Sequence, residues 1–149
     1  MMVTVMISAL LLQGALLMTP QAMPSPHFDV MAAYEAPAKK GASAHVVFEF
    51  KKKDPDVNIN EEPAPRLKFA SGSPLVAPPP PKSSGVIPDP ANAHYLDLNK
   101  PVRFPVTITP DAPRGLSTVK TTLSYFYCSK RENWCRKGTA DFDLAIVLP

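Results

Sequence analysis

Apolar and polar residues alternate with a period of two along most of the chain after residue 42, which is the pattern of a half-buried β-strand. The clearest run is Val102–Thr109, where every second residue from Val102 onward is apolar. Nowhere after residue 30 does a sustained helical period appear. Alternation also predicts strands over His45–Lys51, Thr118–Cys128 and Thr139–Leu148, and shorter extended pieces over Val57–Asn60, Arg66–Ala70 and His94–Leu98.

Each run assigns one face of its strand to a core and the other to solvent. Val47 is expected to point outward with Glu49 and Lys51. Pro105 predicts an edge strand or a bulge, because proline has no N–H to give to a ladder. The expected inward residues are Val46, Phe48, Phe50, Leu67, Phe69, Val102, Phe104, Val106, Ile108, Val119, Thr121, Leu123, Tyr125, Tyr127, Phe142, Leu144, Ile146 and Leu148.

Six or seven short strands separated by turn signals predict an all-β fold, an antiparallel β-sandwich over residues 42–149. The strongest turn signal is the Pro-Asp-Ala-Pro-Arg-Gly sequence at 110–115. Residues 74–90 contain four consecutive prolines among Ser, Lys and Gly, and such a run favours polyproline II and cannot donate to a sheet. This Pro-rich loop is expected to be an extended surface segment, with a ligand for a proline-recognising module as the alternative.

The N-terminus has the composition of an export signal. From Met2 to Met18 nearly every residue is apolar and none is charged, and a polar break ending in the small residue Ala22 follows. Residues 1–22 are therefore expected to be a cleaved secretory signal peptide. No Lys or Arg precedes the apolar run, which leaves a membrane anchor or a buried helix as alternatives. Residues 23–41 are expected to form a flexible N-terminal segment.

Charge and motif content narrow the function classes. The net charge of +3, with acids and bases mixed along the chain, gives no basis for nucleic-acid binding. His27, His45 and His94 lie far apart and have no metal-ligand spacing with a cysteine, so no metal site is predicted. The sequence has no phosphate-binding loop and no nucleophile elbow, so no cofactor is predicted either. A membrane contact is expected only through an uncleaved N-terminal segment.

Cys128 and Cys135 are the one chemically distinctive feature of the chain. Two cysteines close together in an exported protein predict a disulfide, which here would cross the neck of a hairpin loop. One interpretation is a bridge that only staples the hairpin, and an eight-residue loop closed in this way contributes roughly 2.5 kcal/mol. The other is a redox-active pair. The export signal at the N-terminus predicts that the protein is periplasmic or secreted.

Basic residues surround both sulfurs, which favours thiolate over thiol. Lys130, Arg131 and Arg136 are candidates for docking a protein partner, together with Trp134, the aromatic residue beside Cys135. Lys137 adds to the positive charge, and only Glu132 opposes it. Basic residues in a hairpin loop are also commonly just solvated, so both interpretations stay open at this point.

The C-terminal half resembles the N-terminal periplasmic domain of the thiol:disulfide interchange protein DsbD, and the related immunoglobulin-like module of thioredoxin/NHL-repeat proteins. The residues that carry the likeness are the Phe-Pro-Val strand at 104–106, the turn at 110–115, and the Tyr125-Phe126-Tyr127-Cys128 strand end with Cys135 soon after. The resemblance covers roughly residues 42–148, and the last fifty residues contain its motifs.

The resemblance implies an immunoglobulin-like sandwich whose Cys128–Cys135 disulfide passes electrons between a membrane redox protein and thioredoxin-fold proteins. It also implies that Cys135 is the attacking sulfur. The chain departs from the family in its six-residue spacing and in Arg136-Lys137-Gly138, where prolines are usual. Phe69 is the nearest candidate for the aromatic cap over the active disulfide. The alternative function is a non-catalytic secreted sandwich that binds a partner, with a purely structural disulfide.

Overall fold

The structure is a computed structural model that describes residues 21–38, 42–80, 82 and 88–149. The predicted signal or anchor segment, residues 1–22, lies outside this part of the chain except for its last two residues. The described residues form strands, turns and loops without a helix, and so include no helix long and apolar enough to cross a membrane.

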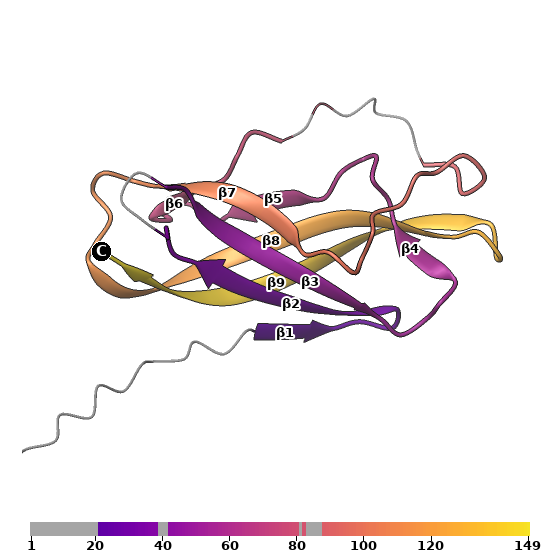
Figure 1. Ribbon diagram of the computed structural model, residues 1–149, viewed down its shortest axis with the longest axis horizontal. Coiled ribbons are helices and arrows are strands. Elements are labelled where there is room, and N and C mark those ends of the chain that lie inside the picture. Colours follow the sequence, from indigo (N-terminus) through magenta and orange to yellow (C-terminus); the bar gives the residue numbers. More distant parts are fainter. Residues whose placement is uncertain (1–20, 39–41, 81, 83–87) are drawn as a thin grey trace, which may run out of the picture.

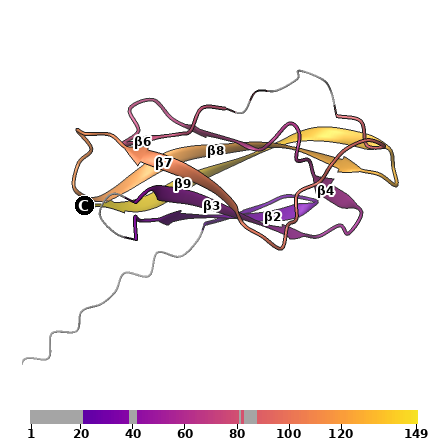
Figure 2. The same ribbon diagram turned by 45° about the horizontal axis from the view of Figure 1, so that its top comes forward.

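Nine strands form two antiparallel sheets that pack against each other, and Figures 1 and 2 show the two layers. The first sheet has the order β1-β2-β3-β7-β6, and in the second sheet β8 pairs with β9 and also with β4 and β5. An all-β fold of two sheets is therefore confirmed. The strands are β1 (Gln21–Pro24), β2 (Phe28–Glu35), β3 (Ala44–Lys52), β4 (Val57–Ile59), β5 (Arg66–Phe69), β6 (Leu75–Val76), β7 (Val102–Ile108), β8 (Gly115–Ser129) and β9 (Trp134–Leu148).

The core lies between the sheets and is built from the faces that the alternation predicted. In β9 the four even-numbered residues from Phe142 to Leu148 are buried, and the odd-numbered residues between them are exposed. In β8 Val119, Thr121, Leu123 and Tyr125 are buried in the same way. Val47 points outward as expected, on the face opposite to Val46 and Phe48 and outside the core cluster, but it is only 7% exposed there.

The cover over Val47 is a salt bridge that crosses the first sheet. Arg103 on β7 donates from Nη1 to Oε1 of Glu35 on β2 at 3.1 Å, and β3 lies between these two strands. Val47 is the residue of β3 that pairs with Arg103. The apolar stem of the arginine therefore shields Val47 from water, although the charged groups themselves stay half-exposed.

Two local expectations need correction. Residues 23–41 were expected to be flexible, but they contain β2, whose Phe28, Val30 and Ala32 are buried. The pattern of β2 was missed because its other face carries the apolar residues Met31 and Ala33, which weaken the contrast. The piece His94–Leu98 forms only an isolated bridge, between Tyr95 and Asn60.

The Pro-rich loop starts with strand structure, because its residues Leu75 and Val76 form β6 and pair with Ile108 and Thr107 of β7. β6 covers only this end of β7. The edge-strand prediction made from Pro105 is confirmed, because the free side of β7 has no strand partner over 102–106 within the described residues.

Candidate functional site

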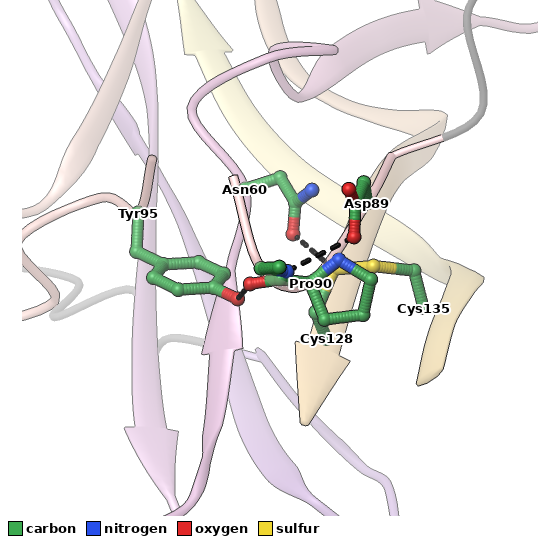
Figure 3. Close-up of a disulfide and its surroundings, with 7 residues drawn as sticks. Asn60, Asp89, Pro90, Tyr95, Cys128 and Cys135 are labelled. Atoms are coloured by element: carbon green, nitrogen blue, oxygen red, sulfur yellow. Dashed lines mark hydrogen bonds between the residues drawn. A yellow bond between two sulfur atoms is a disulfide. The ribbon is translucent and has the colours of Figure 1, made fainter. Parts of the chain in front are cut away.

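The disulfide joins Cys128 near the end of β8 to Cys135 near the start of β9, as predicted (Figure 3). The two residues lie directly opposite each other in an antiparallel ladder that runs from Gly115↔Leu148 to Ser129↔Trp134. A tight loop connects the strands. Asn133 adopts a positive φ of 58°, and the N–H of Glu132 donates to Oγ of Ser129 at 3.1 Å.

The bridge lies on the outer face of the second sheet, away from the first sheet. Side chains alternate across a strand, and Tyr125 and Tyr127 on β8 pack into the core. Cys128 therefore points the other way. The bridge is thus a cross-link within one hairpin and does not connect the two sheets.

The two cysteines differ in exposure although they lie side by side. Cys128 is completely buried, whereas Cys135 is partly exposed. Asn60, Asp89, Pro90 and Tyr95 surround the bridge in Figure 3. A partner that approaches from solvent therefore reaches Cys135 before Cys128.

The residues around the bridge come from two chain segments that pair with each other. The N–H of Asn60 donates to the carbonyl of Phe126 on β8 at 2.8 Å, and the N–H of Glu61 donates to the carbonyl of His94 at 2.8 Å. The Tyr95 hydroxyl donates to the carbonyl of Pro90 at 3.4 Å. Burial and the nearby carboxylate of Asp89 both raise the pKa of Tyr95.

Phe69, the candidate for an aromatic cap, lies elsewhere. It pairs with Thr121 on β8, seven residues before Cys128, which at the rise of a β-strand is roughly 23 Å away. Phe69 therefore does not cover the disulfide. The segments that do were not recognisable in the sequence, because Asn60 and Tyr95 meet through an isolated bridge between segments more than thirty residues apart.

Trp134 lies on the face of the hairpin opposite to the sulfurs. Its ring centroid is 5.5 Å from that of His27 and 5.7 Å from that of Tyr127. Its Nε1–H donates to Oε2 of Glu132 at 2.8 Å, and the guanidinium of Arg136 lies 4.3 Å from the ring centroid. Trp134 and Arg136 therefore form a cluster of aromatic and cation–π contacts on the opposite face from the sulfurs and do not line the path to Cys135.

The two basic residues of the loop also have partners within the chain. Arg131 pairs with Asp56 at 3.2 Å and with Glu132 at 3.5 Å, and Lys130 Nζ lies 5.1 Å from the ring centroid of Tyr95. The structure thus brings all four predicted docking residues close to the disulfide, but each of them makes an intramolecular contact.

A groove of about 830 Å³ lies on the same outer face as the bridge. Phe126 and Lys137, a cross-strand pair one same-face step from the disulfide, line one end of it. Its walls include apolar residues of β5 and of the segment around β6. The charged residues among its lining are Arg66, Lys68 and Lys137, with no acidic residue in the part of the lining that the structure describes. We call this feature the basic groove.

The sequence analysis did not predict the basic groove, although the sequence shows which residues of β5 share a face. The alternation in β5 places Arg66 and Lys68 on one face and Leu67 on the other. What the alternation cannot show is that β5 pairs with β8, so that these cations share a face with Lys137 and the bridge. None of the three cations forms a salt bridge within the described residues.

Within the described part of the chain, no group of three or more His, Cys, Asp and Glu side chains could hold a metal ion. Comparisons with protein-family models, with curated proteins and with solved structures found no match to this chain. The likeness to the DsbD N-terminal domain therefore rests on the quoted sequence motifs.

Proposed function

We propose that this protein is an exported thiol–disulfide exchange module of the DsbD N-terminal type, with an immunoglobulin-like sandwich and Cys128–Cys135 as the exchanging pair. The observation that supports it is the unequal exposure of the two cysteines, with Cys128 buried and Cys135 partly exposed. Exchange needs one sulfur that a partner can reach and a second sulfur beside it that can complete the reaction.

The proposed reaction passes two electrons from the reduced module to a partner disulfide. The Cys135 thiolate attacks one partner sulfur, so that a mixed disulfide forms and the partner's S–S bond breaks. The partner's leaving thiolate takes up a proton. The Cys128 thiolate then attacks Sγ of Cys135, which releases the second partner thiolate and restores the Cys128–Cys135 bond. In the net reaction, the dithiol of the domain is oxidised to a disulfide and the disulfide of the partner is reduced to a dithiol.

The position of the bridge in the ladder supports an exchange role over a staple. The backbone pairing of β8 with β9 spans Gly115 to Ser129 and already fixes the hairpin. The cross-link closes a short loop at one end of this ladder, and such a loop contributes only about 2.5 kcal/mol. The bridge therefore adds stability to the hairpin, but the strands set its alignment by themselves.

The basic groove supports a protein partner with a particular chemistry. We assign to it an extended segment of the partner that carries acidic and apolar side chains next to the partner's cysteine. Arg66, Lys68 and Lys137 are complementary to such a segment in charge, and Phe126 offers it an apolar contact. A thioredoxin-fold protein or a membrane redox protein is the proposed partner class, and the disulfide agrees with an oxidising compartment such as the periplasm or the exterior.

A second candidate function is a secreted interaction module with a purely structural disulfide. The intramolecular contacts of Lys130, Arg131 and Arg136 favour it, because these side chains are then part of the fold and not of a docking surface.

The reduction potential separates the two functions. We expect the purified, oxidised protein to equilibrate with a glutathione or dithiothreitol series between about −120 and −270 mV, where exchange proteins lie. Circular dichroism should show that the reduced protein stays folded. A potential below about −300 mV, or reduction only on unfolding, would assign the disulfide to the structural class. With Cys128→Ser, an exchange module should accumulate a mixed disulfide with glutathione at Cys135.

A further inference from the structure

Asn60 is a buried polar residue whose side chain faces the disulfide. It follows β4 directly, it is 0% exposed, and its Oδ1 lies 3.0 Å from Sγ of Cys128 (Figure 3). Its Nδ2 is also buried and has no hydrogen-bond partner among the described residues. The backbone holds the residue in place through the bond from its N–H to the carbonyl of Phe126.

In the oxidised protein this amide is poorly satisfied. A disulfide sulfur carries no hydrogen, so the contact with Cys128 gives Oδ1 no hydrogen bond. Both polar ends of the Asn60 amide are then removed from water without a strong partner, which is unfavourable. Few other positions in the described core have a polar side chain, so the environment of Asn60 offers little compensation.

Reduction changes what the sulfur can offer. The Cys128 thiol has an S–H that can donate to Oδ1 across the same short distance. With the amide turned by half a rotation, Nδ2–H faces the sulfur and donates to the thiol or, more strongly, to the thiolate. In both orientations the amide gains a better partner when the S–S bond is broken.

We propose that Asn60 is a positioning residue that shifts the Cys128–Cys135 equilibrium toward the dithiol, which makes the disulfide a stronger oxidant. The use of this shift in electron exchange rests on the proposed function, whereas the shift itself does not. The reduced and oxidised states differ by two electrons and two protons, and Asn60 takes part in neither transfer. It acts only through the sulfur that it contacts.

The test is the equilibrium between the module and glutathione, measured for the wild-type protein and for Asn60→Leu, which keeps a similar volume without the amide. We expect the variant to favour the disulfide by about three- to tenfold, the size of one buried hydrogen bond, and tenfold corresponds to about 30 mV. Asn60→Ala is a second variant with the same expected direction, in case leucine does not fit.

Asn58→Ala is the matched control. Asn58 belongs to the same short stretch and pairs with Cys128 in the ladder, but its Oδ1 accepts from Lys52 Nζ at 2.8 Å. Its replacement should leave the glutathione equilibrium unchanged. Urea unfolding of the oxidised and reduced forms gives an independent readout. A residue with a merely structural role would change both stabilities equally, whereas Asn60 should stabilise the reduced form more.

The two proposals fail in different ways. If wild-type protein lies below about −300 mV and Asn60→Leu still shifts the equilibrium, the exchange function is wrong and the role of Asn60 stands. If wild-type protein lies in the exchange range and neither Asn60 variant shifts the equilibrium beyond the control, the role of Asn60 is wrong. Equal loss of stability in both oxidation states also overturns it.

Discussion

The side chains in the two halves of the β8–β9 hairpin are buried in different ways. From Val119 to Tyr125 on β8 and from Ala140 to Leu148 on β9, the inward side chains are buried in the core and the outward ones are more exposed. Beyond Phe126 the outward side chain of Cys128 is buried as well as the inward side chain of Ser129. Cys128 points outward but is completely buried, and Asn60, Asp89, Pro90 and Tyr95 lie around the bridge. The first half is stabilised by the core between the sheets, whereas the second half is also covered on its outer face by other segments of the chain.

The largest expected effect comes from breaking the first half. Phe142 on β9 is 4% exposed, and its ring lies 5.8 Å from that of Phe48 across the core. Phe142→Ala should lower the free energy of unfolding by about 3–5 kcal/mol, measured by urea denaturation. Val147→Ala, on the exposed face of the same strand, is the control and should change it by less than about 0.5 kcal/mol. Similar losses in the two variants would contradict the assignment of faces.

Removal of the bridge tests how far the second half depends on it. Cys128→Ala combined with Cys135→Ala should lower the free energy of unfolding by about 2.5 kcal/mol and leave the β-sheet circular dichroism spectrum unchanged. The physical reason is that the backbone ladder remains when the cross-link is lost. A double variant that does not fold would show that the covering loops need the covalent bond.

The smallest effect concerns the basic groove and the rate of exchange. Lys68 pairs with Thr122, six residues before Cys128, so it lies roughly 20 Å from the bridge. A long acidic peptide with an activated disulfide at its end should react with reduced Lys68→Glu severalfold more slowly than with wild-type protein. A short acidic peptide cannot reach Lys68 and should react with both at the same rate. The readout is release of the chromogenic leaving thiol.

The control for this rate is Lys100→Glu. It makes the same change in net charge at an exposed lysine that does not line the groove. If the two variants slow the long peptide equally, the peptide responds to the total charge of the protein and the groove does not bind it.

The sequence predicted the first half of the hairpin well and the second half poorly, for one physical reason. Period-two alternation reports which face of a strand meets a core, and it correctly placed Leu123, Phe142 and Ile146 inside. It also located the cysteine pair at the hairpin. Burial by a loop leaves no periodic signal. In the sequence Asn60 is only the last residue of an expected extended piece, and its contact with Cys128 makes it part of the site.

The basic groove escaped prediction for a related reason. Alternation gives the face of each strand but not which strands become neighbours. Arg66 and Lys137 lie far apart in the sequence, and the pairing of β5 with β8 and of β8 with β9 brings them to one groove. Charged residues that cluster through strand order are therefore visible only once the topology is known.

The direct opposition of Cys128 and Cys135 also links the disulfide to the register in which β8 and β9 pair. A slip of one residue between β8 and β9 would turn every core side chain of one strand to the wrong face, and it would set Cys128 against Trp134 or Arg136. Within the paired hairpin, the two sulfurs face each other only when the strands are aligned in this register. Oxidation of the paired hairpin therefore fixes the correct alignment covalently, because the one-residue slips would place the two sulfurs on opposite faces.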